Sequence, residues 1–352
     1  MNLALSDDQQ MIREAAAAFL ADASNSAAVR ATAESESGLN ETLWHGIKEL
    51  GWCGVALPEA FGGMNLGATE LVLILEQMGR YLAGSPFFAS VALAGNLLVN
   101  AGSAAAKKKY LPDIAGGARR ATAVFDADGV KAKKAKGGWT LNGKVAAVVD
   151  GAGAELLLVA NAQGAQGVFA VAAGAKGFKS KALKTWDATR RVADIEFKNV
   201  AAERVDDPAK KSGIARARAL AQLYLAAEQL GGAQQCLDLT VKYISERKQF
   251  GRAIGSFQAV KHRCAQMMVL VEGLRSAVYG AAASGDTLEC VGAKALASDT
   301  FFHCAGEAIQ LHGGVGFTWE FEPQLYFKRA QATSHALCAS AQLRETIAEA
   351  LL

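Results

Sequence analysis

The stretch with the strongest chemical signature runs from Arg247 to His262 and reads Arg-Lys-Gln-Phe-Gly-Arg-Ala-Ile-Gly-Ser-Phe-Gln-Ala-Val-Lys-His. It combines basic side chains with two glycines, Gly251 and Gly255, between two helical patterns. Arginine forms charge-assisted hydrogen bonds with phosphate, and the start of a helix offers backbone N–H donors to an anion. The stretch could therefore bind an anion, although the same charges could equally belong to a solvated helical hairpin.

Two long predicted helices flank this stretch and must position it. Residues 217–245 are almost free of helix breakers, and residues 257–279 repeat apolar side chains at helical spacing. Residues 207–352 as a whole predict four long helices with short connections, which is the pattern of an antiparallel bundle.

Two motifs in the C-terminal half resemble those of a known family. The Arg-Lys-Gln-Phe-Gly and Phe-Gln-Ala-Val-Lys-His segments resemble the flavin-binding signature of the acyl-CoA dehydrogenase family. The segment Gln310-Leu-His-Gly-Gly-Val-Gly-Phe-Thr-Trp-Glu320 resembles the C-terminal glycine-rich turn of the same family. The resemblance extends over the chain, because residues 54–63 are similar to a loop of the family's N-terminal domain and residues 186–191 to the Asp-x-Thr-Arg loop of its middle domain.

Length and composition predict a globular enzyme-sized chain. The 352 residues are 51% hydrophobic and 20% charged, which excludes a disordered chain and allows several packed subdomains. A net charge of +3 without a basic, aromatic stripe gives no indication of nucleic-acid binding. The six cysteines form no C-x-x-C pair and the five histidines show no ligand spacing, so we expect reduced thiols and no metal site.

Targeting signals are not evident in the sequence. Asp7, Asp8 and Glu14 lie where a signal peptide would be basic or apolar, and no run is long and apolar enough for a membrane span. We therefore expect a cytoplasmic protein.

The chain changes character twice, which predicts three domains. Residues 1–117 predict helices, starting at a Ser6 N-cap with a stripe through Met11, Ile12, Ala15, Phe19 and Leu20 and continuing at Leu43–Leu50, Glu70–Tyr81 and Ala92–Ala101. Residues 118–206 predict a small antiparallel barrel or sandwich with strands at Thr122–Phe125, Trp139–Leu141, Lys144–Val149, Glu155–Ala160, Val168–Ala172 and Val192–Phe197. Within them, a lysine-rich run ending at Gly137 and Gly138 predicts an exposed hairpin tip. Residues 207–352 form the predicted four-helix bundle.

The predicted fold class is thus mainly α with a small β middle domain, similar to acyl-CoA dehydrogenases. A dinucleotide-binding Rossmann fold is excluded, because strands do not alternate with helices and no G-x-G-x-x-G follows a strand.

The resemblance implies a reaction and its partners. Family members oxidise the Cα–Cβ bond of an acyl-CoA thioester to the trans-2-enoyl thioester, with a carboxylate as base and FAD as hydride acceptor. It therefore implies FAD as cofactor, an acyl-CoA substrate and an electron-transfer flavoprotein as acceptor. Family sites are completed across subunits, which implies a homodimer or a homotetramer built as a dimer of dimers.

The resemblance also assigns cofactor-binding residues. By matching motif positions, Arg247 would reach the FAD diphosphate of a neighbouring subunit, Phe250 would pack on the dinucleotide, and Gln258 would contact its adenosine end. The glycine turn would let the backbone approach the same cofactor, since glycine has no Cβ. Its assigned residues are Gln310, Gly313, Gly314 and Gly316.

The sequence departs from the family pattern at three places. The flavin loop with Thr-Glu-Pro is replaced by Ala123-Val-Phe-Asp-Ala-Asp-Gly129, and Ala147 and Val149 stand where the family has Trp-x-Thr. The catalytic base is missing from both usual positions, which fall near residues 337–339 and near Ala221. These departures leave the source of the base open.

Glu228 is the remaining candidate for the base. It lies on an otherwise apolar helix, about two turns after Ala221 on the same face. A carboxylate in such a setting is costly unless it is paired or functional. Glu228 is therefore either the catalytic base or a structural carboxylate that pairs with an arginine or caps backbone groups.

The same absences favour a second interpretation of the whole chain. Some bacterial family members that act on large thioesters, such as steroid side chains, are heteromeric pairs. In them a shorter subunit lacks the base and lends its Arg-x-x-Phe-Gly motif to the FAD of its partner. This chain is similar to that subunit, so a catalytically silent partner in a heterotetramer is the alternative to a self-sufficient dehydrogenase. A purely structural helical scaffold is a third possibility, against which the intact motifs argue.

Overall fold

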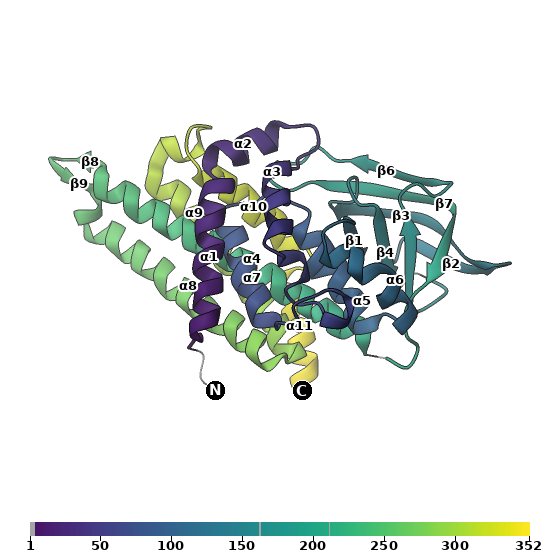
Figure 1. Ribbon diagram of the computed structural model, residues 1–352. Coiled ribbons are helices and arrows are strands. Elements are labelled where there is room, and N and C mark those ends of the chain that lie inside the picture. The colour runs from purple at the N-terminus through teal and green to yellow at the C-terminus, as the bar shows by residue number, and fades with distance from the viewer. Residues whose placement is uncertain (1–3, 162, 211) are drawn as a thin grey trace. The chain divides into compact units, whose positions relative to one another are not determined.

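The computed structural model describes residues 4–161, 163–210 and 212–352, which form helices on either side of a β segment in the sequence (Figure 1). The N-terminal part contains the helices α1 (Asp7–Ala23), α2 (Ser26–Glu34), α3 (Glu41–Glu49), α4 (Ala68–Arg80), the π-helix η3 (Phe88–Gly95), α5 (Asn96–Ala101) and α6 (Ala104–Ala115). The predicted Ser6 cap is confirmed, because its Oγ accepts from the Gln9 N–H at 3.2 Å and Gln9 Oε1 accepts from the Ser6 N–H at 3.1 Å. The predicted stripe is wrong at Met11, which is 60% exposed, and at Ala15, which is also exposed, since Ala16 and Leu20 form the buried face of α1.

The middle segment forms a seven-stranded sheet. Its strands are β1 (Ala121–Val124), β2 (Val130–Ala135), β3 (Gly138–Val149), β4 (Leu156–Ala160), β5 (Val168–Ala172), β6 (Phe178–Ala182) and β7 (Val192–Arg204). They run in the order β1-β4-β5-β7-β3-β2, with β6 also paired to β7. All these pairs are antiparallel except β1 with β4, and the two predicted runs at 139–141 and 144–149 form one continuous strand, β3.

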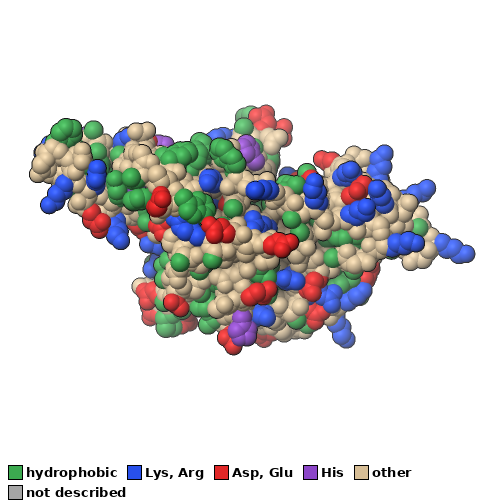
Figure 2. Space-filling view, turned by 90° about the horizontal axis from the view of Figure 1, so that it is seen from above, with side chains coloured by type: hydrophobic (Ala, Val, Ile, Leu, Met, Phe, Trp, Pro, Cys, Tyr) green, Lys and Arg blue, Asp and Glu red, His purple; other side chains and the backbone are tan. Residues whose placement is uncertain are grey.

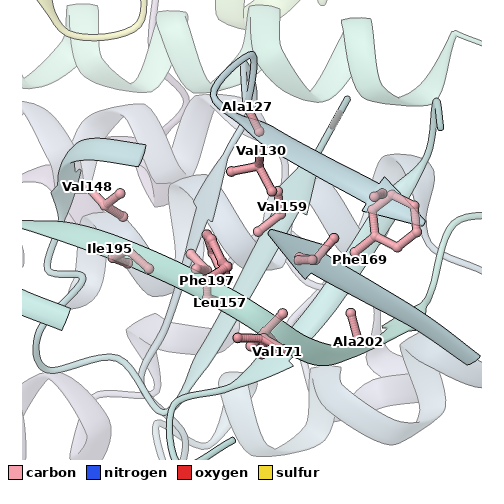
Figure 3. Packing of buried hydrophobic residues seen from close by; sticks show 13 residues of the cluster. Ala127, Val130, Val148, Leu157, Val159, Phe169, Val171, Ile195, Phe197 and Ala202 are labelled. Atoms are coloured by element: carbon pink, nitrogen blue, oxygen red, sulfur yellow. The ribbon is translucent and has the colours of Figure 1, made fainter. Parts of the chain in front are cut away.

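The sheet holds together through alternation of buried and exposed side chains. Apolar residues from β2, β3, β4, β5 and β7 pack into one cluster (Figure 3). Trp139 packs against this cluster, with its ring 5.1 Å from that of Phe169. In β2, Val130 and Ala132 are buried in this cluster, while Lys131 and Lys133 are exposed. Ala135 pairs with Gly138, so the predicted lysine-rich hairpin tip is confirmed, and Figure 2 shows lysine and arginine side chains gathered over this end of the sheet.

The C-terminal part is helical, as predicted. It contains α7 (Gly213–Glu246), α8 (Gln258–Ser284), α9 (Thr287–His312), α10 (Pro323–His335) and α11 (Ser340–Leu351). In place of a fourth long helix the chain forms two short ones, because it turns at residues 336–339, where Leu337 and Cys338 have positive φ angles of 57° and 95°. Both short helices pack against α9.

By packing, the chain groups into two compact units. The first comprises residues 1–30, 68–83 and 222–352, and the second comprises residues 31–67 and 84–221. The predicted boundaries of three domains stay a prediction. Within the described ranges no helix is long and apolar enough to cross a membrane.

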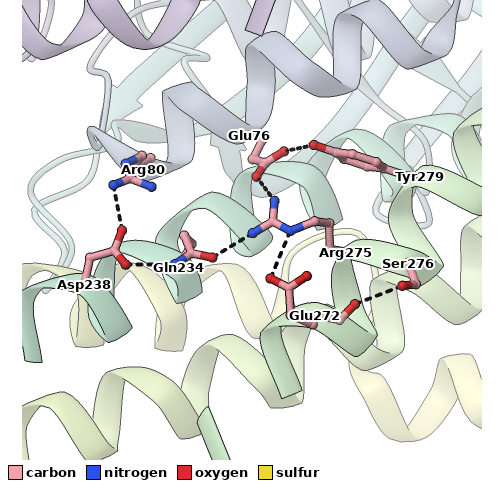
Figure 4. A network of polar contacts seen from close by, with 8 residues as sticks. All are labelled: Glu76, Arg80, Gln234, Asp238, Glu272, Arg275, Ser276 and Tyr279. Carbon is pink, nitrogen blue, oxygen red and sulfur yellow. Dashed lines mark hydrogen bonds and ion pairs between the residues drawn. The ribbon is translucent and has the colours of Figure 1, made fainter. Parts of the chain in front are cut away.

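A buried polar network links three helices of the first unit (Figure 4). Glu76 of α4 accepts hydrogen bonds from Arg275 and, at 2.6 Å, from the Tyr279 hydroxyl of α8. Arg275 also donates to Gln234 of α7 at 2.7 Å, and Gln234 donates to Asp238 at 2.9 Å. Burial disfavours the charge on Arg275, but the Glu76 carboxylate outweighs this effect and raises the pKa of the guanidinium. The network therefore fixes how α4, α7 and α8 pack.

Candidate functional site

The arginine motif forms a short β-hairpin between α7 and α8. Strand β8 (Lys248–Gln249) pairs with β9 (Arg252–Ala253), and the hairpin stands at the end of the helix pair in Figure 1. Phe250 and Gly251 form its turn with φ angles of 53° and 78°. Two consecutive positive φ angles suit the twist of a two-residue hairpin, but they are unfavourable for phenylalanine. The turn therefore holds Phe250 in a position that local backbone preference does not explain.

The hairpin presents an aromatic and cationic surface. Phe250 is 92% exposed, and its ring meets that of Phe257 edge-on at 6.2 Å. The Arg252 guanidinium lies 4.0 Å from the centre of the Phe257 ring. Arg247 is exposed at the base of the hairpin, where its backbone N–H donates to Tyr243 O at 2.9 Å and its carbonyl accepts from the Ile254 N–H at 2.8 Å. A flat apolar ligand with an anionic group would complement this surface.

Gln258 begins α8 directly after the hairpin. Its side chain is exposed, and the preceding Phe257 provides no side-chain cap for the helix. The first N–H groups of an uncapped helix are free to bind an acceptor such as a phosphate or carboxylate oxygen. Gln258 and the helix start thus extend the donor surface of the hairpin.

The glycine-rich turn lies between α9 and α10, in the short helix η5 (Gly313–Phe317). A Cβ added at Gly316 would lie 2.8 Å from Ile309 O and 2.9 Å from the Cβ of His312, so the fold itself requires this glycine. At Gly313 and Gly314 an added Cβ would meet no described atom within 4 Å, although the φ of +66° at Gly313 is unfavourable for other residues. The packing of the chain therefore gives no reason for Gly314, whereas close approach of a ligand would.

The two motifs meet through an aromatic cluster. Tyr243, in the last turns of α7, stacks on His312 at the end of α9, with ring centres 4.3 Å apart and planes inclined by 20°. Phe321 packs edge-on against both rings at 6.2 and 6.3 Å. The helix ends that carry Arg247 and Gly313 are thus in direct contact, which the sequence did not predict.

His312 should make the stability of this cluster depend on pH. Burial lowers the pKa of His312 below its ordinary value of 6.5, although its Nδ1 lies 2.7 Å from Ala308 O. The unfolded chain therefore binds more protons than the folded chain as the pH falls below about 6.5, so this contribution to stability is present above that value and lost in acid. We expect the free energy of unfolding to fall between about pH 7 and about pH 5, and to fall less in His312→Gln.

Urea unfolding of both chains at the two pH values measures this difference. His45→Gln is the matched control, because His45 is exposed and its only described ionic contact is with the exposed Glu49. An equal acid dependence in the wild-type chain and in His312→Gln would contradict the assignment.

The far end of the glycine turn is fixed by Trp319, a residue that the sequence did not single out. Arg30 hydrogen-bonds to the Trp319 carbonyl, and its guanidinium lies 5.0 Å from the centre of the indole ring. The Lys328 ammonium lies 5.8 Å from the same ring. Cation–π contacts of this kind hold the exposed turn to α10 and to the N-terminal part of the first unit.

Glu228 lies at the crossing of α4 and α7. It is 6% exposed, and a Cβ added at Gly79 of α4 would come within 1.9 Å of its carbonyl oxygen. Glu228 precedes Arg247 by nineteen residues on a continuous helix, which is roughly 28 Å along the axis. The structure therefore buries Glu228 between helices and separates it from the hairpin.

The turn at 336–339 has no acid where the family resemblance places a base. Cys338 lies there, and its thiol donates to Gln342 Oε1 at 3.3 Å. The Leu337 carbonyl accepts from Gln222 Nε2 at 2.9 Å, which ties the turn to α7. The turn is thus held by neutral contacts.

A buried lysine lies at the start of this turn. Lys294 of α9 donates to Ser298 Oγ at 2.6 Å and to the Thr333 carbonyl at 3.3 Å, near the end of α10. Burial lowers its pKa to about 8. Since the C-terminal end of a helix favours a cation, Lys294 acts as an internal cap of α10.

The sequence also departs from the family pattern in the middle segment, at Ala147 and in the 123–129 loop. Ala147 has a φ of 54° at an irregularity between β3 and β7, is exposed, and donates its N–H to Asp194 Oδ1 at 3.1 Å. In the 123–129 loop, Asp126 is paired with Arg218 at 2.8 Å. Ala147 and Asp126 thus offer neither an aromatic ring nor a hydroxyl to a flavin, and the Phe125 ring of the loop is buried.

The remaining titratable clusters give no indication of metal binding. All six cysteines are free and five of them are buried. Over residues 4–161, 163–210 and 212–352 no three His, Cys, Asp or Glu side chains are placed to hold an ion.

Comparisons with known proteins agree with the motifs. The family model "Acyl-CoA dehydrogenase, N-terminal domain" matches residues 6–118, and "Acyl-CoA dehydrogenase, C-terminal domain" matches residues 215–352. The acyl-CoA dehydrogenase IpdE2 of Mycolicibacterium smegmatis is 33% identical over 334 residues, which cover 95% of each chain. IpdE2 of Mycobacterium tuberculosis is 34% identical and covers 94% of this chain and 93% of its own.

Two solved structures share the whole fold. A chain of the ChsE4-ChsE5 complex from Mycobacterium tuberculosis is 28% identical, with a TM-score of 0.93 over 100% of this chain and 99% of its own. A chain of the Tcur3481-Tcur3483 steroid ACAD, a G363A variant, is 29% identical, with a TM-score of 0.90 over 97% of both. The predicted fold class is thereby confirmed.

Proposed function

The chain belongs to the acyl-CoA dehydrogenase family, and from this premise we propose that it takes part in the FAD-dependent α,β-dehydrogenation of an acyl-CoA thioester as the subunit that completes the FAD site of a catalytic partner. When bound, FAD supplies the hydride acceptor. The observation that carries this proposal is the exposed hairpin, which offers Phe250 and Arg247 to a ligand in a chain that has no carboxylate at residues 336–339.

The residues of the first unit fit the dinucleotide part of FAD. Arg247 would hold the diphosphate, Phe250 would cover an apolar face of the cofactor, and Gln258 would donate to the adenosine end. Gln310 is exposed before the glycine turn, and Gly313 and Gly314 leave space that a side chain would fill. Gly316 supports the turn from inside rather than facing the cofactor, since an added Cβ there would meet the chain itself.

The departures in the rest of the chain support a partner role. Removal of the α proton needs a positioned base in a dry pocket, and Cys338 is a weak substitute for a carboxylate in its neutral surroundings. The relatives point the same way, because two of the similar structures are named as complexes of two proteins. We infer a heterotetramer, with an acyl-CoA substrate on the partner and an electron-transfer flavoprotein as acceptor.

The second candidate is a self-sufficient homodimeric or homotetrameric dehydrogenase with Glu228 as its base. Its supporting observation is a buried carboxylate on an apolar stretch of α7. If this candidate is right, Glu228→Gln abolishes the formation of enoyl-CoA by the purified chain, while fold and flavin content are retained. If Glu228 is structural, the purified wild-type chain forms no enoyl-CoA, and Glu228→Gln changes its stability alone.

The absorbance spectrum of the chain, purified alone, is the first test. Anaerobic addition of a panel of acyl-CoA esters should leave it colourless, or yellow and unreduced. Bleaching of a bound flavin by one ester would overturn the partner role and establish the second candidate.

Arg247→Ala should weaken FAD retention by about 10- to 100-fold, because one charge-assisted phosphate contact contributes about 1.5–3 kcal/mol. The measurement is the FAD content after gel filtration of the chain, co-purified with its catalytic partner. Lys248→Ala is the matched control, since Lys248 is an exposed cation on the same hairpin. Equal retention in Arg247→Ala and Lys248→Ala would remove Arg247 from the site.

A further inference from the structure

A separate cavity of about 240 Å³ lies in the second unit. It is bounded by the loop after α2, by the turn before η3, by the start of β1 and by the 150–154 loop after β3. None of the residues assigned to FAD lines it. The ligand of this cavity therefore has to be inferred from the residues that line it.

The walls are held by hydrogen bonds of the backbone. Asp150 has a φ of 52°, and its N–H donates to Arg191 O at 2.9 Å. The Gly153 and Ala154 N–H groups donate to Asp150 O at 3.0 and 3.1 Å, which closes the loop. The cavity is therefore preformed on this side and does not depend on a ligand for its shape.

Arg191 fixes the opposite wall. Its Nη2 donates to the carbonyls of Ala33 and Ser35 at 3.0 and 2.5 Å, at the end of α2. The backbone of Gly38 packs against the Arg191 side chain with a φ of +63°. A Cβ added at Gly38 would lie 2.1 Å from Arg191 Nε. The Nη2 of this guanidinium is thus used by the fold, whereas its buried Nε has no hydrogen-bond partner among the described residues.

Arg120 is different, because its side chain is available. Its backbone N–H is anchored to Glu155 Oε2 at 3.0 Å, at the start of β1. Among the described residues its guanidinium makes no hydrogen bond or ion pair. The adjacent Arg119, by contrast, is paired with Asp113 at 2.7 Å. Arg120 therefore presents a fork of unused donors at the cavity.

We propose that this cavity binds a small carboxylate with an apolar body. The Arg120 fork matches the two oxygens of a carboxylate. Leu39, Pro86, Ala121 and Ala154 provide an apolar lining for the rest of the ligand. Two acids, Glu36 and Asp150, also border the cavity. Glu36 is exposed and therefore screened by solvent, and the half-buried Asp150 is opposed by the two arginines of the lining, Arg120 and Arg191. A volume of about 240 Å³ is below the roughly 300–1,000 Å³ of drug-sized sites, which selects a short chain rather than a whole CoA ester.

Calorimetric titration of the full chain with hexanoate, hexanamide and inorganic phosphate tests the proposal. Hexanoate should bind saturably with one site per chain, while hexanamide, which lacks the charge, and phosphate, which lacks the apolar body, should bind at least about tenfold more weakly. Absence of hexanoate binding at millimolar concentration would overturn the site. Phosphate binding as strong as that of hexanoate would overturn the apolar part of the assignment.

Two variants locate the binding. Arg120→Met should weaken hexanoate binding by about tenfold or more, while Arg119→Met, which removes the same charge one residue away, should leave it unchanged. Ala182→Trp should fill the cavity from an exposed strand position that tolerates an aromatic side chain. Equal binding by Arg120→Met and Arg119→Met, or full binding by Ala182→Trp with an unchanged unfolding midpoint, would contradict this placement.

Discussion

Glu76→Ala should lower the free energy of unfolding by about 3–5 kcal/mol, because it removes a buried carboxylate that both Arg275 and Tyr279 contact. The Glu76 side chain is 5% exposed and accepts from Arg275 and Tyr279 together. Burial and the Glu76 charge both raise the pKa of Tyr279, so its hydroxyl stays a donor to the carboxylate. Removal of Glu76 therefore breaks two contacts and leaves the partly buried Arg275 with only Gln234 and the exposed Glu272.

Glu272→Ala is the matched control, since Glu272 contacts the same arginine at 3.3 Å but is 55% exposed. Exposed ion pairs contribute about 0–1 kcal/mol, so the control should unfold close to the wild-type chain in urea. If Glu76→Ala lowers the free energy of unfolding no more than Glu272→Ala does, water or a shift of α8 must solvate the Arg275 charge in place of Glu76.

The sequence predicted this region as helices but not as a network. Periodicity identified α4, α7 and α8, because apolar residues recur along each of them. Glu76 and Arg275 are 199 positions apart, and no local pattern relates two such residues. The pairing depends on how the helices pack, which only tertiary structure determines.

Local sequence pattern also failed to predict two strands of the sheet, β2 and β6. Strands rich in valine, leucine and isoleucine were predicted, whereas β2 and β6 were missed because their exposed faces are lysine-rich. β6 has almost no buried residue of its own and is held by pairing with β7. Strand propensity reflects packing against neighbours, so such a strand is invisible without its partner.

The candidate site residues were assigned through motif resemblance rather than through physical derivation, and their role in binding stays a prediction. The hairpin, the exposed Phe250 and the open Gly313–Gly314 turn agree with a ligand-binding role. The contact between the two motifs rests on Tyr243, His312 and Phe321, which spacing alone could not bring together. The positive φ of Phe250 was also unpredictable, because local preferences oppose it and the hairpin register imposes it.

Gly231→Ala should destabilise the chain by at least about 3 kcal/mol, against the ordinary preference of helices for alanine. An added Cβ at Gly231 would lie 1.7 Å from Glu76 O and 2.8 Å from the Arg80 N–H nitrogen. These are backbone atoms of α4, so the two helices would have to separate. The separation would also disturb the Glu76 network and the burial of Glu228, which lies one turn away at the same crossing.

Gly280→Ala provides the comparison that isolates this effect. Gly280 lies inside α8, and an added Cβ there would meet no described atom within 4 Å. Helix propensity then acts alone, and the variant should gain up to about 1 kcal/mol in urea unfolding. If Gly231→Ala lowers the free energy of unfolding and Gly280→Ala raises it, the contact between α4 and α7, rather than backbone entropy, requires glycine at position 231. If both variants raise the free energy of unfolding, α4 can move away from α7. The crossing could then not hold Glu228 rigidly enough for it to act as a base.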